Sequence, residues 1–253
     1  MILRICAGAI MAALLTGSAQ ATPLIVFTTD FNGALPAEIT PGTATLTGVQ
    51  GYAGLGPVGN QFGGNFLRSA TGNVVTLNLA GLPTHDTISL AFLFAAIDSL
   101  DGTGTFPSGD YFRIVFDGVQ LFSESFANAT PAQIQSYVAP AGVELARRVD
   151  LGFTPGGPDS FYSDSAYNLG ADPLFSNFAH TGSTAKIEFY IFGEGNQDLA
   201  DESWAMDNLT VSVSTTRGVP TGIPEPSTLA LFGAGLAGLG ALRRRKKTQV
   251  SKA

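Results

Sequence analysis

Cysteine and tryptophan are almost absent from this sequence. Among 253 residues the chain has one cysteine, Cys6, and one tryptophan, Trp204. Cys6 lies in a short apolar stretch near the N-terminus that has the pattern of a removable leader. Once that leader is gone, the chain has no disulfide, no thiolate nucleophile and no cysteine-ligated metal. Its stability then depends on core packing, to which a bound cation could add.

Positive charge is scarce in the middle of the chain. Residues 22–222 contain six Lys and Arg against 19 Asp and Glu, a net charge of −13. A body this acidic repels nucleic acid and anionic lipid, so we expect no nucleic acid as a partner. The excess of carboxylates suits a soluble domain outside the cell, or the binding of divalent cations.

Long amphipathic helices are also missing. The chain is rich in Gly (31) and Phe (18), and several short runs alternate apolar and polar residues, as half-buried strands do. Asp117-Gly118 between two such runs is a strong hairpin signal. We predict an all-β fold, an antiparallel two-sheet sandwich of the jelly-roll type, over residues 22–214. The predicted strands are Leu24–Thr29, Val74–Leu79, Thr87–Ile97, Tyr111–Phe116, Val119–Phe122, Lys186–Phe192 and Leu209–Val213, with Thr87–Ile97 buried on both faces.

The N-terminal segment 1–21 has the three parts of a secretory signal peptide. Arg4 supplies a positive start, Ile5–Leu15 an apolar run, and Ala19-Gln20-Ala21 a small-x-small cleavage site. We expect the Sec translocon to export the chain and cleavage to fall between Ala21 and Thr22. The alternative is an uncleaved anchor, which the short apolar run disfavours.

The C-terminal segment 223–253 follows a linker at 215–222 and has three parts in close succession. Pro224, Glu225 and Pro226 form an extended peptide that an enzyme can bind as a strand. An apolar helix is expected over 228–242. As a helix, Leu229–Leu242 rises about 21 Å, short of the roughly 30 Å hydrocarbon core, so it suits a transient span better than a permanent tail anchor. A stop-transfer cluster then consists of Arg243, Arg244, Arg245, Lys246 and Lys247.

These three parts, in this order, resemble a PEP-CTERM sorting domain. The resemblance implies a Gram-negative host and an exosortase, a membrane cysteine protease that cleaves near Pro224–Pro226. It also implies transient contact with the inner membrane, a place at the cell surface or in the extracellular matrix, and association with exopolysaccharide and biofilm.

A second resemblance covers roughly residues 24–213. It is carried by Leu82–Asp86, Asp98–Gly102, Gly109–Gly118 and Asp201–Asn208, the last placed before the final strand. These runs look like the jelly-roll ectodomain of exported PEP-CTERM proteins and are similar to concanavalin-like and carbohydrate-binding sandwiches. The resemblance implies a non-catalytic binding or matrix domain.

Six acids in two loops are candidate calcium ligands. Calcium takes six to eight oxygens, mostly carboxylates and carbonyls from flexible loops, and a structural calcium would suit a chain without disulfides. The alternative is that the acids cap turns and solvate loops. The candidates are Asp98, Asp101 and Asp110 in one loop system, and Asp201, Glu202 and Asp207 before the last strand.

Sugar binding and catalysis are weighed from other residues. Tyr52, Phe62, Tyr162 and Tyr167 lie in loop-like stretches, where they either stack on sugars or fill the core. The sequence has no Gly-x-Ser-x-Gly and no His-Glu-x-x-His motif, and its two histidines lie far apart. We expect no enzyme, with a secreted glycoside hydrolase, which needs only two carboxylates, as the alternative.

Overall fold

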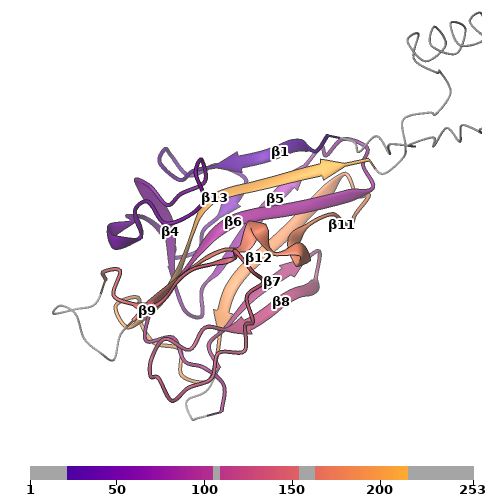
Figure 1. Ribbon diagram of the computed structural model, residues 1–253. Helices are drawn as coiled ribbons and strands as arrows, with labels where there is room; N and C mark the ends of the chain where they lie inside the picture. The colour runs from indigo at the N-terminus through magenta and orange to yellow at the C-terminus, as the bar shows by residue number, and fades with distance from the viewer. Residues whose placement is uncertain (1–21, 105–108, 154–162, 216–253) are drawn as a thin grey trace, which may run out of the picture. The chain divides into compact units, whose positions relative to one another are not determined.

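The computed structural model describes residues 22–104, 109–153 and 163–215 (Figure 1). The predicted signal peptide, nearly all of the predicted linker and the C-terminal tail lie outside the described residues. The described strands are β1 (Leu24–Thr29), β2 (Ile39–Thr40), β3 (Thr45–Gly48), β4 (Asn65–Ala70), β5 (Val74–Ala80), β6 (Thr87–Asp98), β7 (Tyr111–Phe116), β8 (Val119–Ser125), β9 (Glu144–Val149), β10 (Asp164–Asn168), β11 (Phe178–Ala179), β12 (Thr184–Phe192) and β13 (Glu202–Ser214).

Helix is confined, within the described ranges, to three short 3₁₀ turns. These are η1 (Gln50–Tyr52), η2 (Leu169–Ala171) and η3 (Pro173–Phe175). No helix in the part of the chain that the structure describes has the length and hydropathy of a membrane span. The apolar segment 228–242 lies outside that part.

The strands form two antiparallel sheets, which confirms the all-β sandwich predicted from the alternating pattern. One sheet has eight strands, with the order β3-β4-β13-β6-β10-β9, while β1 also pairs with β13 and β11 with β6. The other sheet has five strands, in the order β2-β5-β12-β7-β8. Strands β6 and β13 run side by side through the middle of the larger sheet (Figure 1).

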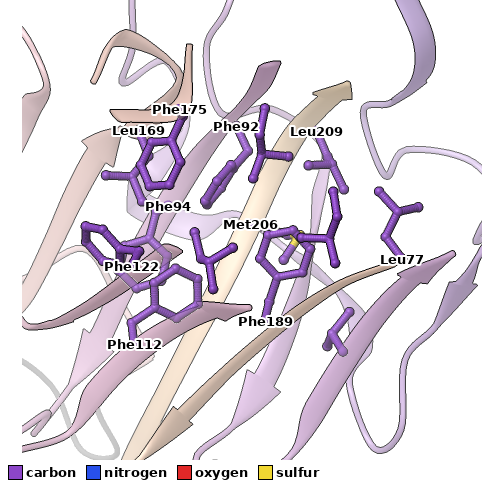
Figure 2. Close-up of a cluster of buried hydrophobic side chains, with 14 of the residues drawn as sticks. Leu77, Phe92, Phe94, Phe112, Phe122, Leu169, Phe175, Phe189, Met206 and Leu209 are labelled. Atoms are coloured by element: carbon purple, nitrogen blue, oxygen red, sulfur yellow. The ribbon is translucent and has the colours of Figure 1, made fainter. Parts of the chain in front are cut away.

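The main core lies between the two sheets and is dominated by phenylalanine. Phe94 of β6 faces Phe112 of β7, with ring centroids 4.2 Å apart, and Phe92 faces Phe189 of β12 at 5.7 Å (Figure 2). Trp204 of β13 is fully buried against Phe112. Aromatic pairs at these distances add to the burial of their large apolar areas, so the core is both large and specific.

The second half of β6 is buried on both faces, as its long apolar run predicts. Its outer face is covered by a second cluster that includes Tyr52, Phe62 and Phe66, which pack on Leu93, Ala95 and Ile97. The first half of β6 keeps an alternating burial pattern. The loop that contains η1 therefore acts as a partial third layer over one end of the larger sheet.

The Asp117-Gly118 hairpin forms as predicted. It joins β7 to β8, and both residues have positive φ, 48° and 81°, as a tight two-residue hairpin turn requires. The Asp117 carboxylate also accepts a hydrogen bond from the backbone N of Lys186 on β12, at 2.8 Å. The turn is thus attached to the neighbouring strand.

The last strand begins earlier than the sequence indicates. It starts at Glu202, whereas the alternation of apolar and polar residues predicts a start at Leu209. Residues Glu202–Asp207 are polar or mixed, yet they pair with β6 on one side and, over Ser203–Met206, with β4 on the other. The register shifts between Asp207 and Thr210, where Asn208 has a φ of 51°. Burial on both faces hides the alternation in the first half of β13.

The phenylalanine core generates a stability prediction. Replacing buried Phe94 with alanine (Phe94→Ala) leaves a cavity and is expected to lower the free energy of unfolding by about 3–5 kcal/mol. The matched control is Phe192→Ala, because Phe192 is 55% exposed and is expected to cost less than about 1 kcal/mol. Urea unfolding measures both, and equal losses would contradict the core assignment.

Candidate functional site

The structure brings three of the six predicted calcium ligands together. Asp101 and Asp110 lie in the connection between β6 and β7, and Glu202 is the first residue of β13. One carboxylate oxygen from each lies within 4.8 Å of the other two, and all three residues are buried. We call Asp101, Asp110 and Glu202 the carboxylate cluster.

Neutral donors hold the carboxylate cluster in place. The backbone N of Asp101 donates to Asp110 Oδ2 at 2.5 Å, and the Gln133 side chain donates to Asp101 Oδ1. Gln197 donates to both oxygens of Glu202, from Nε2 at 2.9 Å and from its backbone N at 3.2 Å. Among the described residues, no lysine or arginine forms an ion pair with these carboxylates.

The electrostatic result is that all three carboxyl groups resist ionisation. Burial raises the pKa of Glu202, and the nearby Asp110 raises it further. Burial also raises the pKa of Asp110 and of Asp101. A divalent cation between the three groups would supply the missing positive charge, and oxygen is the ligand that calcium prefers. Asp101, Asp110 and Glu202 are therefore the residues of this chain that could hold calcium.

Backbone packing closes around the cluster. A Cβ at Gly193, in the connection between β12 and β13, would lie 2.5 Å from Asp110 Oδ1. Only glycine leaves this carboxylate its present position, so the connection passes directly against the cluster.

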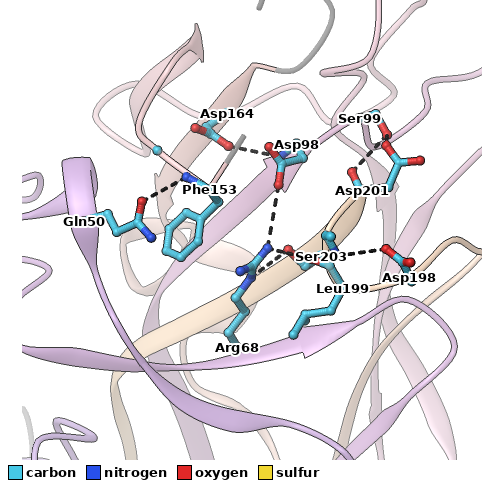
Figure 3. A network of polar contacts seen from close by, with 12 residues as sticks. Gln50, Arg68, Asp98, Ser99, Phe153, Asp164, Asp198, Leu199, Asp201 and Ser203 are labelled. Carbon is cyan, nitrogen blue, oxygen red and sulfur yellow. Dashed lines mark hydrogen bonds and ion pairs between the residues drawn. The ribbon is translucent and has the colours of Figure 1, made fainter. Parts of the chain in front are cut away.

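The other three predicted ligands lie elsewhere and bind protein groups. Asp98 lies 3.6 Å from the Arg68 guanidinium, and Asp201 Oδ1 accepts a hydrogen bond from Ser99 Oγ at 2.8 Å (Figure 3). Asp207 Oδ2 accepts from the backbone N of Gly63 at 3.1 Å. These acids hold strands and loops in place, as the alternative interpretation expects.

A buried polar network next to Asp98 has no signal in the sequence (Figure 3). Arg68 of β4 donates to Ser203 Oγ at 2.9 Å and to the Leu199 carbonyl at 2.7 Å, and its guanidinium lies 4.3 Å from the Phe153 ring centroid. Asp164 of β10 accepts from the backbone N of Asp98 at 3.0 Å. Burial raises the pKa of Asp164 to about 7. The scarcity of positive charge is the one hint that Arg68 is structural.

The aromatic residues considered for sugar stacking are core residues where the structure describes them. Tyr52 and Tyr167 are fully buried and Phe62 is 2% exposed. The Tyr52 hydroxyl donates to the Ala96 carbonyl at 3.0 Å, deep in the sheet. Stacking on sugar is thus wrong for these three, because sugars need an exposed ring face. Tyr162 lies outside the described residues.

Comparisons with known proteins identify the tail. The family described as the PEP-CTERM protein-sorting motif matches residues 222–246. The chain therefore carries this sorting motif, which implies exosortase processing and export to the cell surface in Gram-negative bacteria. The match includes Pro224–Pro226 and most of the basic cluster.

The sandwich has only distant likenesses. The catalytic domain of Agl-KA aligns with a TM-score of 0.32 and 15% identity, over 85% of this chain and 31% of that one. The catalytic domain of a GH87 alpha-1,3-glucanase aligns with a TM-score of 0.28 and 18% identity, over 82% and 31% of the two chains. The CBM22-1–GH10 modules of a Clostridium thermocellum xylanase align with a TM-score of 0.26 and 8% identity, over 81% and 30%.

This chain thus spans less than a third of the length of these solved structures. A search of the curated proteins finds no match. Function must be argued from the residues of this chain and from its sorting motif.

Asp164 generates a pH prediction. Its pKa of about 7 exceeds the value of about 3.9 in an unfolded chain, so between these pH values the folded state holds a proton that the unfolded state has released. Stability of the metal-free protein is expected to rise as pH falls from about 8 to 5, by up to about 1.4 kcal/mol per unit for this group. Urea unfolding in chelator measures the slope.

The variant Asp164→Asn is expected to flatten that slope, because it removes the titrating group. Asp198→Asn, at an exposed carboxylate, is the matched control and should leave the slope unchanged. A stability that falls on mild acidification would contradict the prediction.

The carboxylate cluster generates a calcium prediction. Calcium well above its dissociation constant is expected to raise the thermal midpoint of the wild type by about 5–10 °C over the midpoint in chelator. Glu202→Gln removes one ligand charge, so it should abolish this response and raise the midpoint in chelator by relieving repulsion. The matched control is Asp207→Asn, a buried acid outside the cluster, which should keep the response. An identical wild-type midpoint with calcium and with chelator would rule out the site.

Proposed function

We propose that this protein is a non-catalytic β-sandwich that export and exosortase processing deliver to the extracellular matrix, where it associates with exopolysaccharide. The observation that carries the proposal is the PEP-CTERM sorting motif at 222–246, which follows a sandwich whose last strand ends at Ser214. A short apolar segment and a basic cluster suit a tail that holds the chain at the membrane until a transferase cuts it.

The geometry of the acids favours a binding role over glycoside hydrolysis. Glycosidases place two carboxyl groups about 5–9.5 Å apart on either side of an accessible sugar bond. The carboxylate cluster is tighter than this, buried, and closed by hydrogen bonds from protein groups. A sugar ring has no room between its members.

A surface groove beside β9 offers a polar site of the kind that polysaccharides bind. Its lining includes Gln135, Val138, Glu144 and Arg147. Glu144 and Arg147 are exposed on this outermost strand of the larger sheet, and Val138 is 86% exposed. Carboxylate, guanidinium and amide groups next to an apolar floor match the hydroxyls and the C–H faces of a glycan chain. We place the polysaccharide contact here.

Exopolysaccharide from a host that carries an exosortase tests the matrix role. The protein is expected to bind this polymer saturably and to release no reducing ends, and Arg147→Ala should weaken binding about tenfold, as expected for a lost charge-assisted contact. The matched control is Lys186→Ala, an exposed cation on β12 that pairs with Glu188. Turnover of the polymer would support the glycoside hydrolase alternative, and absence of binding would contradict the matrix role.

Processing has its own measurement. Mass spectrometry of the protein recovered from its host is expected to find a C-terminus near Pro224–Pro226, because the exosortase removes the apolar segment and the basic cluster. Replacing Pro224 and Pro226 together with alanine should leave the tail attached. An intact Arg243–Lys247 cluster on the wild-type surface protein would contradict exosortase processing.

A further inference from the structure

The two histidines of the chain, 95 residues apart in sequence, meet in the structure. His85 lies in the connection between β5 and β6, and His180 lies between β11 and β12. His85 Nε2 is 2.6 Å from His180 Nδ1. The ring planes differ by 22° and the centroids lie 4.9 Å apart, so the rings are nearly coplanar and meet edge to edge through these nitrogens.

Both outer nitrogens of the pair face groups that can only accept hydrogen bonds when the carboxylate is ionised. His85 Nδ1 lies 2.6 Å from the Pro83 carbonyl oxygen. His180 Nε2 lies 3.3 Å from Asp117 Oδ2, at the β7–β8 turn. His85 is 2% exposed, and the His180 side chain is 7% exposed, so water does not easily replace these partners.

The number of protons follows from these contacts. The contact with Pro83, the contact between the rings and the contact with Asp117 each need one N–H, which makes three in total. Two neutral imidazoles carry two N–H groups, so the arrangement needs one more proton. A fourth proton would put hydrogen on both nitrogens of the 2.6 Å contact and two positive charges side by side. The geometry is therefore satisfied by one added proton for the pair.

The surroundings supply one clear counter-charge. Asp117 Oδ1 accepts from the backbone N of Lys186, which leaves Oδ2 toward His180. The Lys186 ammonium pairs with Glu188 at 2.7 Å, and Asp86 follows His85 in the chain. On another side, the apolar Phe116 ring meets His180 edge-on, with centroids 5.3 Å apart.

We propose that His85 and His180 share a single added proton balanced by Asp117, and that this proton makes the joint between the two sheets sensitive to pH. The pair joins the β5–β6 connection and the β11 end to the turn of the smaller sheet. The backbone supports the same joint, because His180 N donates to the Asp86 carbonyl at 3.1 Å. Loss of the proton leaves a lone pair facing a carboxylate, and gain of a second breaks the contact between the rings.

Nitrogen NMR of the histidine side chains in the full-length protein tests the proposal. The chain has two histidines, so the spectrum contains only these two imidazoles. At about pH 7, the expected spectrum shows one imidazolium and one neutral ring with its proton on Nδ1. Two neutral rings at this pH would overturn the proposal.

Two variants give the test a matched comparison. Asp117→Asn offers an amide N–H to His180 Nε2, so it should leave two neutral rings at about pH 7. Glu188→Gln, on the adjacent strand, should leave the imidazolium in place. Loss of the imidazolium in both variants, or in neither, would overturn the assignment of Asp117 as the counter-charge.

A double-mutant cycle supplies a second readout that a merely structural contact would not give. The coupling between Asp117→Asn and His180→Gln is expected to be about two- to fivefold in the unfolding equilibrium constant near pH 7, and to vanish near pH 9. An equal coupling at both pH values would overturn the dependence on the shared proton. Unfolding that depends on added zinc would overturn it as well, since a metal would then hold the pair.

Discussion

The pairing of β6 with β13 is the interaction on which the rest of the sandwich depends. Both strands lie inside the larger sheet, and their shared register extends from Glu202–Asp98 at one end to Ser214–Thr87 at the other. Phe92 and Phe94 of β6, with Trp204 and Met206 of β13, form the wall of the main core on this side. Because backbone groups deep in a sheet must be paired, this central ladder also fixes where the flanking loops begin and end.

Polar chemistry is sorted to the two ends of that central pair. At the Glu202 end, buried carboxylates from the β6–β7 connection and from β13 approach one another without a cationic partner among the described residues. At the other end, the histidine pair and Asp117 join loops of both sheets. Both ends contain groups whose charge state depends on conditions outside the protein, whereas the middle is apolar. Ion and proton concentrations can thus act on the ends of the sandwich without a change in its core.

Much of the fold was predictable because alternation is visible where one face of a strand meets solvent. The strand Tyr111–Phe116 and the Asp117-Gly118 turn were predicted with their observed bounds. Alternation fails where both faces are buried or where polar residues are satisfied inside the protein. The strand Asp164–Asn168 is polar and entirely buried, and the first half of β13 pairs on both sides, so neither was predicted.

The candidate sites follow the same division. Asp101 and Asp110 are close in sequence, and the expectation that they meet Glu202 needed only the closure of neighbouring loops. Asp98 and Asp201 are as close in sequence, but they lie against other partners, and no sequence pattern reveals on which side of a turn a carboxylate ends. The contacts of Arg68 with Ser203 and of His85 with His180 join residues about a hundred positions apart. Such contacts depend on strand order, which one sequence does not contain.

The position of the last strand has a mechanical consequence. The chain leaves the sandwich from β13, which is hydrogen-bonded to β6 on one side and to β4 and β1 on the other. A force applied beyond Ser214, as flow or a tethered polymer would exert, is directed along the strand. It must therefore shear both ladders at once, and cannot open them one bond at a time as it could from an edge strand. Attachment through this strand gives the domain resistance to pulling that its thermodynamic stability alone would not provide.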